Sequence, residues 1–199
     1  MKKRTLAVLA ALCAAVTLSG CFEAAVMGAS ATVLAAVDRR TTGTQIEDEG
    51  IELRAVNRIG ERFGDKLHVN VTSFNRNVLL TGEVTDATVR SEIEKIVRSL
   101  PNVRGVTNES QVAGVSAYSA RASDASITGK VKARFLDAGK FNAVHVKVVT
   151  EAGVVYLIGI VTEKEAADAT EIARTTSGVR KVVKVFEYCK PTEEVCRPR

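Results

Sequence analysis

Apolar residues recur along the chain first at helical spacing and then at strand spacing. Between residues 51 and 63 an apolar residue occupies every fourth position, as in a helix with one buried face. Leu67, Val69 and Val71 then alternate with polar residues, which is typical of a strand with one buried face. A turn-forming segment, a strand with an internal glycine, a second amphipathic helix and a last strand follow. The pattern predicts the order αββαβ.

This succession of elements occurs twice. The segment LLTGEVTD at residues 79–86 returns as YLIGIVTE at residues 156–163. Before the second copy, Ile127, Val131 and Phe135 again have helical spacing, and an alternating strand and a turn again follow them. An internal repeat of this kind indicates two copies of one structural unit.

The repeat also predicts where the domains begin and end. We expect the two units at residues 48–112 and 124–188, with a polar linker at 113–123 and a tail at 189–199. Each unit has about 65 residues, which is enough to bury one face of a small sheet under two helices. The predicted fold class is therefore α+β, with two tandem αββαβ domains, each a small mixed sheet with two helices. In each unit we expect the first helix to be short and the second to be longer.

Two residue types at repeated positions indicate structural roles. Asp48 and Asp124 come just before the first apolar residues of the predicted helices, where a carboxylate can cap free N–H groups. Gly82 and Gly159 lie inside predicted strands, where glycine is normally unfavourable. Close approach of a helix backbone, or a β-bulge, would account for both glycines. We interpret them as structural rather than catalytic.

The first residues form a secretory signal. A basic cluster at residues 2–4 precedes an uncharged apolar stretch at residues 6–18. The letters that follow, LSGC, look like a bacterial lipobox, which predicts that residues 1–20 are removed and that Cys21 is acylated. The alternative is an ordinary secreted protein with a chance cysteine at the cleavage site.

Residues 21–47 then form the predicted acylated tether. Phe22 stands where an aspartate often marks retention at the inner membrane, which favours sorting to the outer membrane, on its periplasmic side. Acyl chains provide a stable anchor because each buried methylene contributes about 0.8 kcal/mol. No other segment reaches the roughly 18 apolar residues that a spanning helix needs.

Charge and cysteine content exclude some classes of partner. Removal of the signal peptide lowers the formal net charge from +5 to +2, because it deletes three basic residues and no acidic one. The charge therefore does not indicate a nucleic-acid partner. Cys189 and Cys196 remain near the C-terminus, and an oxidising periplasm permits a disulfide between them. We favour the disulfide over a metal-binding pair, because no histidine lies nearby.

The sequence does not indicate catalysis, a cofactor or a metal. His68 and His145 occupy the same repeat position, between inward apolar residues, and are interpreted as surface residues of a strand. No further ligands are patterned around them. No nucleophile motif and no glycine-rich phosphate loop occurs. We therefore predict no catalytic residue, no cofactor and no metal ligand.

The repeated motifs resemble those of the BON domain. Both units contain D-x-x-I, a strand h-V-x-V and L-x-G-x-V. The second unit also contains G-V-x-x-V and the first its close variant N-V-x-x-V, and the resemblance covers both units nearly end to end. The segments 42–56 and 146–166 are similar to one group in particular, the dual BON-domain outer-membrane lipoproteins. This resemblance implies a non-enzymatic protein that binds anionic phospholipid through its second domain and supports outer-membrane integrity. It also implies contact with the outer-membrane protein assembly machinery as a further role.

The first helix of the second unit is the candidate lipid site. It carries four basic residues and a single acid, Asp137, and each basic side chain near an anionic surface contributes roughly 1 kcal/mol. Lys130 and Arg134 lie four residues apart and are expected to share an exposed face. The residues proposed for lipid binding are Lys130, Arg134, Ile127, Gly129, Thr128, Lys140 and Phe141.

Two features limit this interpretation. The chain has no Trp, and Ser126 stands at the predicted helix start, where an aromatic residue would help insertion into a membrane interface. Tyr118 in the linker and Phe141 are possible substitutes. A charged helix face can also be merely solvated.

The alternative function is a protein-interaction adaptor or chaperone-like factor that uses the exposed sheet, through His145 or Lys147, or the groove between the units.

Overall fold

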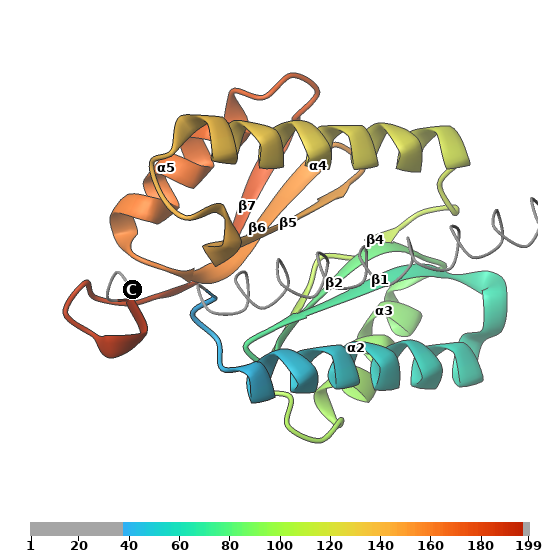
Figure 1. The fold of residues 1–199 in the computed structure, drawn as a ribbon. Coiled ribbons are helices and arrows are strands. Elements are labelled where there is room, and N and C mark those ends of the chain that lie inside the picture. The colour runs from blue at the N-terminus through green and yellow to red at the C-terminus, as the bar shows by residue number, and fades with distance from the viewer. Residues whose placement is uncertain (1–37, 197–199) are drawn as a thin grey trace, which may run out of the picture. The chain divides into compact units, whose positions relative to one another are not determined.

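The computed structural model describes residues 38–196, so the signal peptide, Cys21 and residues 22–37 of the tether lie outside the described residues. The first domain, in blue to green in Figure 1, consists of α2 (Thr42–Phe63), β1 (His68–Phe74), β2 (Asn77–Val84), α3 (Ala87–Arg98), β3 (Gly105–Asn108) and β4 (Gln111–Val112). The second domain consists of α4 (Tyr118–Ala138), β5 (Val146–Glu151), β6 (Val154–Val161), α5 (Glu163–Arg174) and β7 (Lys181–Tyr188). Short 3-10 turns lie at Gly64–Lys66, Ala143–His145 and Glu194–Cys196.

Each domain forms one mixed sheet. In the first, β1 is antiparallel and β3 parallel to the central β2, and β4 pairs further along β2. In the second, β5 is antiparallel and β7 parallel to the central β6, over all eight residues of β7. The predicted α+β fold with two αββαβ domains is therefore confirmed.

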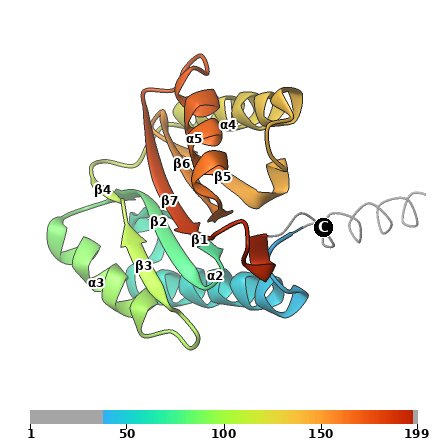
Figure 2. The same ribbon diagram turned by 90° about the vertical axis from the view of Figure 1, so that its left-hand side faces the viewer.

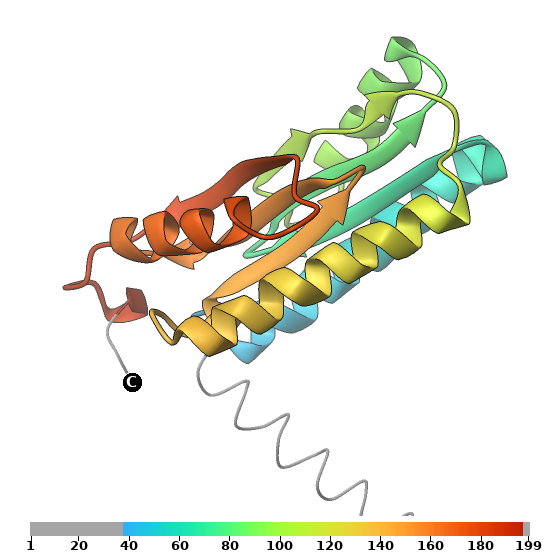
Figure 3. The same ribbon diagram turned by 90° about the horizontal axis from the view of Figure 1, so that it is seen from above.

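Two helices cover one face of each sheet (Figures 1 and 2). Figure 3 shows α4 lying lengthwise beside β5, and α2 packs against β1 in the same way. The predicted inward residues of α4, Ile127, Val131 and Phe135, are all buried, as are Ile51, Ala55 and Ile59 of α2. No helix among residues 38–196 has the length and apolar character needed to cross a membrane.

The predicted helix lengths and helix starts were wrong. α2 has 22 residues and α4 has 21, whereas α3 and α5, expected to be longer, have 12 each. Residues 42–47 of the predicted tether and 118–123 of the predicted linker are helical. Apart from the exposed Tyr118, the first turns of both long helices carry mostly small and polar residues without an apolar period, so the hydrophobic pattern begins only inside the helix. Thr41 caps α2 by accepting a hydrogen bond from the Thr44 N–H.

Asp48 and Asp124 therefore do not cap helices, since both lie in mid-helix. The Asp48 carboxylate accepts hydrogen bonds from the N–H groups of Asn75 (2.8 Å) and Arg76 (2.7 Å). Asp124 accepts equivalent bonds from Ala152 (2.9 Å) and Gly153 (2.8 Å). These four N–H groups belong to the two-residue turns of the β1–β2 and β5–β6 hairpins. The repeated aspartate thus fastens each hairpin turn to the long helix.

All four turn residues have positive φ, between 49° and 71°. Two successive residues in this region form the hairpin turn that suits the twist of antiparallel strands. Three of the four are not glycine, and positive φ is unfavourable for such residues. The hydrogen bonds to the aspartate carboxylates therefore stabilise these turns. The turn that the sequence predicts between the first two strands of each unit is confirmed.

Gly82 and Gly159 lie against the backbone at the start of the neighbouring strand, and not against a helix. A Cβ at Gly82 would lie 2.0 Å from the carbonyl oxygen of His68, and one at Gly159 would lie 2.1 Å from that of His145. Any side chain would clash, so the close approach that the sequence indicates comes from the preceding strand or turn of the hairpin.

The second face of each sheet is also buried, which the sequence analysis did not anticipate. Besides one core beneath each pair of helices, a third apolar cluster joins the sheets. Its buried members are Phe74, Leu79, Tyr156, Ile158, Ile160, Cys189 and Cys196. Polar contacts surround it, including Lys147 to Glu52 at 3.0 Å and Asn77 to Glu187 at 2.8 Å. The expected exposed sheet surface for an adaptor is therefore an interface between the domains.

The C-terminal tail completes this third cluster. Cys189 and Cys196 form a disulfide, with their Cα atoms 6.1 Å apart. Both cysteines are buried, at 8% and 3% exposure. The bridge therefore holds the tail against the apolar residues between the sheets, in addition to closing a small loop.

Candidate functional site

The outward face of α4 is the first candidate site. Helical periodicity places a row of exposed residues opposite the buried Ile127, Val131 and Phe135. We call this row, with the two lysines at its borders, the α4 surface: Tyr118, Ala122, Ala125, Gly129, Ala133 and Leu136, bordered by Lys130 and Lys132. Tyr118 is 85% exposed and Leu136 is 71% exposed, so large apolar side chains stand at both ends of a smooth row of small residues.

The structure reverses the expectation about the helix start. Ser126 lies in the middle of α4, and the first helical residue is Tyr118. An aromatic side chain therefore does stand at the start of this helix. The guanidinium of Arg121 lies 4.9 Å from the centre of the Tyr118 ring, and it also donates hydrogen bonds to the Ser116 carbonyl oxygen.

Arg134 does not share an exposed face with Lys130. Its Nη1 donates hydrogen bonds to the carbonyl oxygen of Ile172 (2.8 Å) and to Oγ1 of Thr176 (2.7 Å). Both acceptors lie at the C-terminal end of α5, where helix carbonyl groups lack partners and attract a cation. Arg134 thus fastens α4 to α5, and the expected Lys130–Arg134 pair does not form a common binding face.

Three other residues proposed for lipid binding also pack within the domain. Ile127 is buried, and its side chain lies beside Gly178. The Thr128 hydroxyl donates a hydrogen bond to that of Thr150 at 2.7 Å. The Phe141 ring stands edge-on to Phe135, with centroids 5.0 Å apart.

Only three of the seven are exposed, whereas Thr128, Arg134 and Phe141 are half-buried. Gly129 and Lys130 lie on the exposed side of α4, and Lys140 follows the helix. Lys140 is paired with Asp168 at 3.5 Å, and Lys164 lies 2.7 Å from the same carboxyl group. The hydrogen bond from Lys164 lowers the pKa of Asp168. Sequence reasoning missed Tyr118, Lys132 and Leu136 as members of one surface, although their spacing within a longer helix would have shown it.

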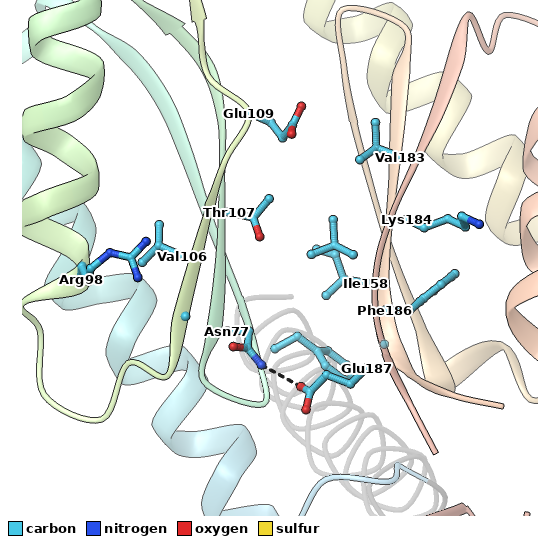
Figure 4. Close-up of a pocket in the computed structure, with 14 residues that line it drawn as sticks. Asn77, Arg98, Val106, Thr107, Glu109, Ile158, Val183, Lys184, Phe186 and Glu187 are labelled. Carbon is cyan, nitrogen blue, oxygen red and sulfur yellow. Dashed lines mark hydrogen bonds between the residues drawn. The ribbon is translucent and has the colours of Figure 1, made fainter. Parts of the chain in front are cut away.

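A groove between the domains is the second candidate site. It has a volume of about 550 Å³ and lies between β3 of the first sheet and β7 of the second. Figure 4 shows Thr107 and Glu109 on one wall and Ile158 and Val183 on the other. The hydrogen bond from Asn77 to Glu187 lies at one end.

Two buried carboxylates and a histidine meet at another part of the domain interface. His68 Nδ1 lies 2.8 Å from Glu83 Oε2, and Asn70 donates a hydrogen bond to Glu151 Oε2 at 2.8 Å. The ligand atoms of His68, Glu83 and Glu151 all lie within 4.8 Å of one another. Burial raises the pKa of the Glu151 carboxyl. The hydrogen bond from Asn70 lowers this pKa by less than burial raises it, and the negative charge of Glu83 raises it further.

The two histidines are thus not surface residues. The His68 side chain is 17% exposed and that of His145 is 13% exposed. His68 points away from the helix face of its sheet as predicted, but that side faces the second domain. His145 lies in a 3-10 turn before β5, with Nδ1 3.5 Å from Glu165.

The described end of the tether is held by the second domain. Arg39 donates hydrogen bonds to the Ile160 carbonyl oxygen (2.8 Å) and to both carboxylate oxygens of Glu165 (2.7 and 3.0 Å). Glu165 also accepts a bond from the Thr162 N–H at the start of α5. Burial alone would raise the pKa of Glu165, but the bonds from Arg39 and Thr162 outweigh it and lower the pKa to about 2.

Comparison with known proteins shows which family the two domains match. The BON domain family matches residues 48–114 and 123–190. The chain is 36% identical over 177 residues to the outer membrane lipoprotein DolP of Haemophilus influenzae, covering 88% of this chain and 92% of that protein. It is 31% identical over 154 residues to a 21 kDa hemolysin of Actinobacillus pleuropneumoniae, covering 76% of this chain and 79% of that protein.

Among solved structures, the C-terminal domain of CdsD, a structural protein of the type III secretion system of Chlamydia trachomatis, is 12% identical. That alignment covers 68% of this chain and 96% of the other, with a TM-score of 0.30. A TM-score this low carries no argument about function.

Proposed function

The chain belongs to the BON-domain family, and on that premise we propose a membrane-surface function for it. An acyl group on Cys21 anchors the protein at the periplasmic side of the outer membrane. The α4 surface of the second domain binds anionic phospholipid, and this binding supports outer-membrane integrity. The family is non-enzymatic, so the protein acts by binding rather than by catalysis.

The α4 surface is the observation that carries this proposal. Tyr118 and Leu136 stand about 27 Å apart along the helix, which is suited to a helix lying flat on a membrane. A tyrosine ring favours the membrane–water interface because it is apolar with a polar end. Lys130 and Lys132 can extend their ammonium groups to phosphate while their methylene stems lie along the surface. The small residues between allow close approach of the helix backbone.

The acyl anchor makes weak binding sufficient. Each lysine near an anionic surface contributes roughly 1 kcal/mol, which alone gives little affinity. A tether holds the domain at high effective concentration near the bilayer, so a small preference for anionic head groups is enough to keep α4 on the membrane.

Vesicle co-sedimentation tests the charged part of the surface. The mature chain from Phe22 onward, without the acyl group, should sediment with anionic vesicles and not with zwitterionic ones. In Lys130→Glu/Lys132→Glu the affinity for anionic vesicles should fall by on the order of 30-fold at low salt. The matched control is Lys66→Glu/Lys95→Glu, which reverses two exposed lysines of the first domain. Equal loss in both double variants would contradict a site on α4.

A second pair of variants tests the apolar part of the surface. Leu136 on α4 and Leu53 on α2 are similarly exposed, at 71% and 64%. Leu136→Ser should weaken vesicle binding by about fivefold, because the side chain no longer leaves water on binding. Leu53→Ser should not change it, and both variants should keep their unfolding free energy within about 0.5 kcal/mol. Unchanged binding in Leu136→Ser would mean that α4 does not insert.

The groove between β3 and β7 favours a second function, that of a protein-interaction adaptor. It is the groove that the sequence analysis proposed between the two units, and the strands beside it could pair with an extended peptide. A photo-crosslinking residue at Thr107 or Lys184 would capture a partner seated there. Crosslinks from these positions would favour the adaptor over the lipid surface if the α4 variants also sediment with anionic vesicles as the wild type does.

A further inference from the structure

His68, Glu83 and Glu151 bring three metal-binding groups together from three strands. His68 begins β1, Glu83 lies near the end of β2, and Glu151 ends β5. Two of the residues belong to the first domain and one to the second. We propose that they form a site for one divalent transition-metal cation, with Zn²⁺ as the probe, and that the bound cation joins the two domains.

The spacing of the ligand atoms suits this proposal. One nitrogen and two carboxylate oxygens lie within 4.8 Å of one another, and His68 Nδ1 and Glu83 Oε2 are 2.8 Å apart. Around a zinc ion with bonds of about 2.1 Å, neighbouring ligand atoms are roughly 3–3.5 Å apart. Small rotations of the side chains therefore bring all three groups onto one ion. Imidazole nitrogen and carboxylate oxygen are ligands that zinc accepts, and water would complete the coordination.

Further contacts hold the carboxylates in place. Asn70 donates to Glu151 Oε2 at 2.8 Å, and the backbone N–H of Ser116 donates to Glu83 Oε2 at 3.3 Å. Such outer contacts commonly orient metal ligands. The Ser116 hydroxyl is itself buried without a hydrogen-bond partner, which leaves a polar atom next to the carboxylate pair unsatisfied.

The charge balance points to a cation. Glu83 and Glu151 are only 7% and 6% exposed, and among residues 38–196 no lysine or arginine forms an ion pair with either. Two carboxylates buried together without a cation are unfavourable. His68 can supply one positive charge at most, and a divalent ion would neutralise both carboxylates.

The repeat shows that the site is not a feature of the scaffold. Glu83 follows Gly82, whereas the residue after the equivalent Gly159 is Ile160. The equivalent histidine, His145, lies beside Glu165 instead. Between the two repeats, only the first thus has a glutamate directly after the strand glycine to meet its histidine, and the third ligand comes from the other domain.

Calorimetric titration with Zn²⁺ tests the proposal on the full mature lipoprotein in detergent, prepared without a histidine tag and freed of metal by a chelator. The wild type should bind one zinc ion per chain, and zinc should raise its melting temperature by mass action. Glu151→Gln and His68→Gln should each weaken binding by at least about tenfold. His145→Gln and Glu187→Gln are the matched controls, since they alter a histidine and an interface carboxylate outside the cluster, and both should bind zinc as the wild type does.

Either of two titration results would overturn the inference. One is the absence of zinc binding by the wild type. The other is binding that Glu151→Gln and His68→Gln leave unchanged, which would place zinc elsewhere on the surface. Because a variant can fail to fold, Co²⁺ absorption of the unmodified chain provides a second measurement. Bound Co²⁺ should show the d–d absorption of nitrogen and oxygen coordination, and this absorption should disappear when zinc displaces the cobalt ion. A spectrum identical to that of Co²⁺ in buffer would also contradict the site.

Discussion

The two domains share their scaffold and differ at the surfaces proposed to bind. Each has a long helix whose mid-helix aspartate holds a hairpin turn, and each has a central strand in which a glycine lies against neighbouring backbone. The outward faces of the long helices differ. The α2 helix exposes acidic residues, such as Glu49 and Glu61, among its apolar ones, whereas the α4 surface is bordered by lysines. Positions that repeat thus specify the fold, and positions that do not repeat carry the candidate functions.

Replacement of the strand glycines should produce the largest effect on the shared scaffold. Gly82→Ala and Gly159→Ala each place a Cβ about 2 Å from a carbonyl oxygen, so each should destabilise the protein by about 3 kcal/mol or more. Gly129→Ala is the control, because no atom lies within 4 Å of its Cβ and alanine favours a helix; it should stabilise by up to about 1 kcal/mol. Urea unfolding measures all three. A well-tolerated Gly159→Ala beside a damaging Gly82→Ala would break the equivalence of the domains.

Removal of the turn-holding carboxylates should have an intermediate effect. Asp48 accepts three hydrogen bonds from the turn region, including that of the Ser73 hydroxyl, and pairs with Arg40, whereas Asp124 accepts two. Each change to alanine leaves buried N–H groups unsatisfied, and we expect about 1–3 kcal/mol of destabilisation, larger for Asp48. Equal loss at both sites, measured by urea unfolding, would mean that only the turn N–H bonds matter.

The last expected effect is a pH dependence that comes from Glu165 of the second domain. The pKa of Glu165 is lowered to about 2 in the folded protein, from an ordinary value of 4.5. A lowered pKa stabilises the fold above the unfolded value, so this contribution is present above about pH 4.5 and is lost as the pH falls towards 2. Arg39→Met should flatten the fall in the urea midpoint across this range. An unchanged slope would show that Arg39 does not hold the carboxylate in solution.

Much of the scaffold could be predicted from local patterns. The element order, the inward residues of the helices and both hairpin turns follow from spacings of two to four residues, which backbone geometry dictates. The lipid site was predicted less well. Lys130 is exposed as expected, but Arg134 binds the end of α5, because the carbonyl groups that attract it lie about 40 residues away along the chain. A helical period locates a side chain on a helix and does not reveal such partners.

The sequence by itself determined two αββαβ units, their hydrophobic cores under the helices, the residues that need glycine, and the predicted lipidation at Cys21. Tertiary structure alone decided that the long helices begin before their apolar pattern, that the sheets bury their second faces, and that His68 and Glu83 meet Glu151. The reason is range. Periodicity encodes which face of an element is apolar. The partner of a polar side chain, or of a strand residue buried on the second face of its sheet, depends on segments that are distant along the chain, as in the Asn70–Glu151 contact across 81 residues.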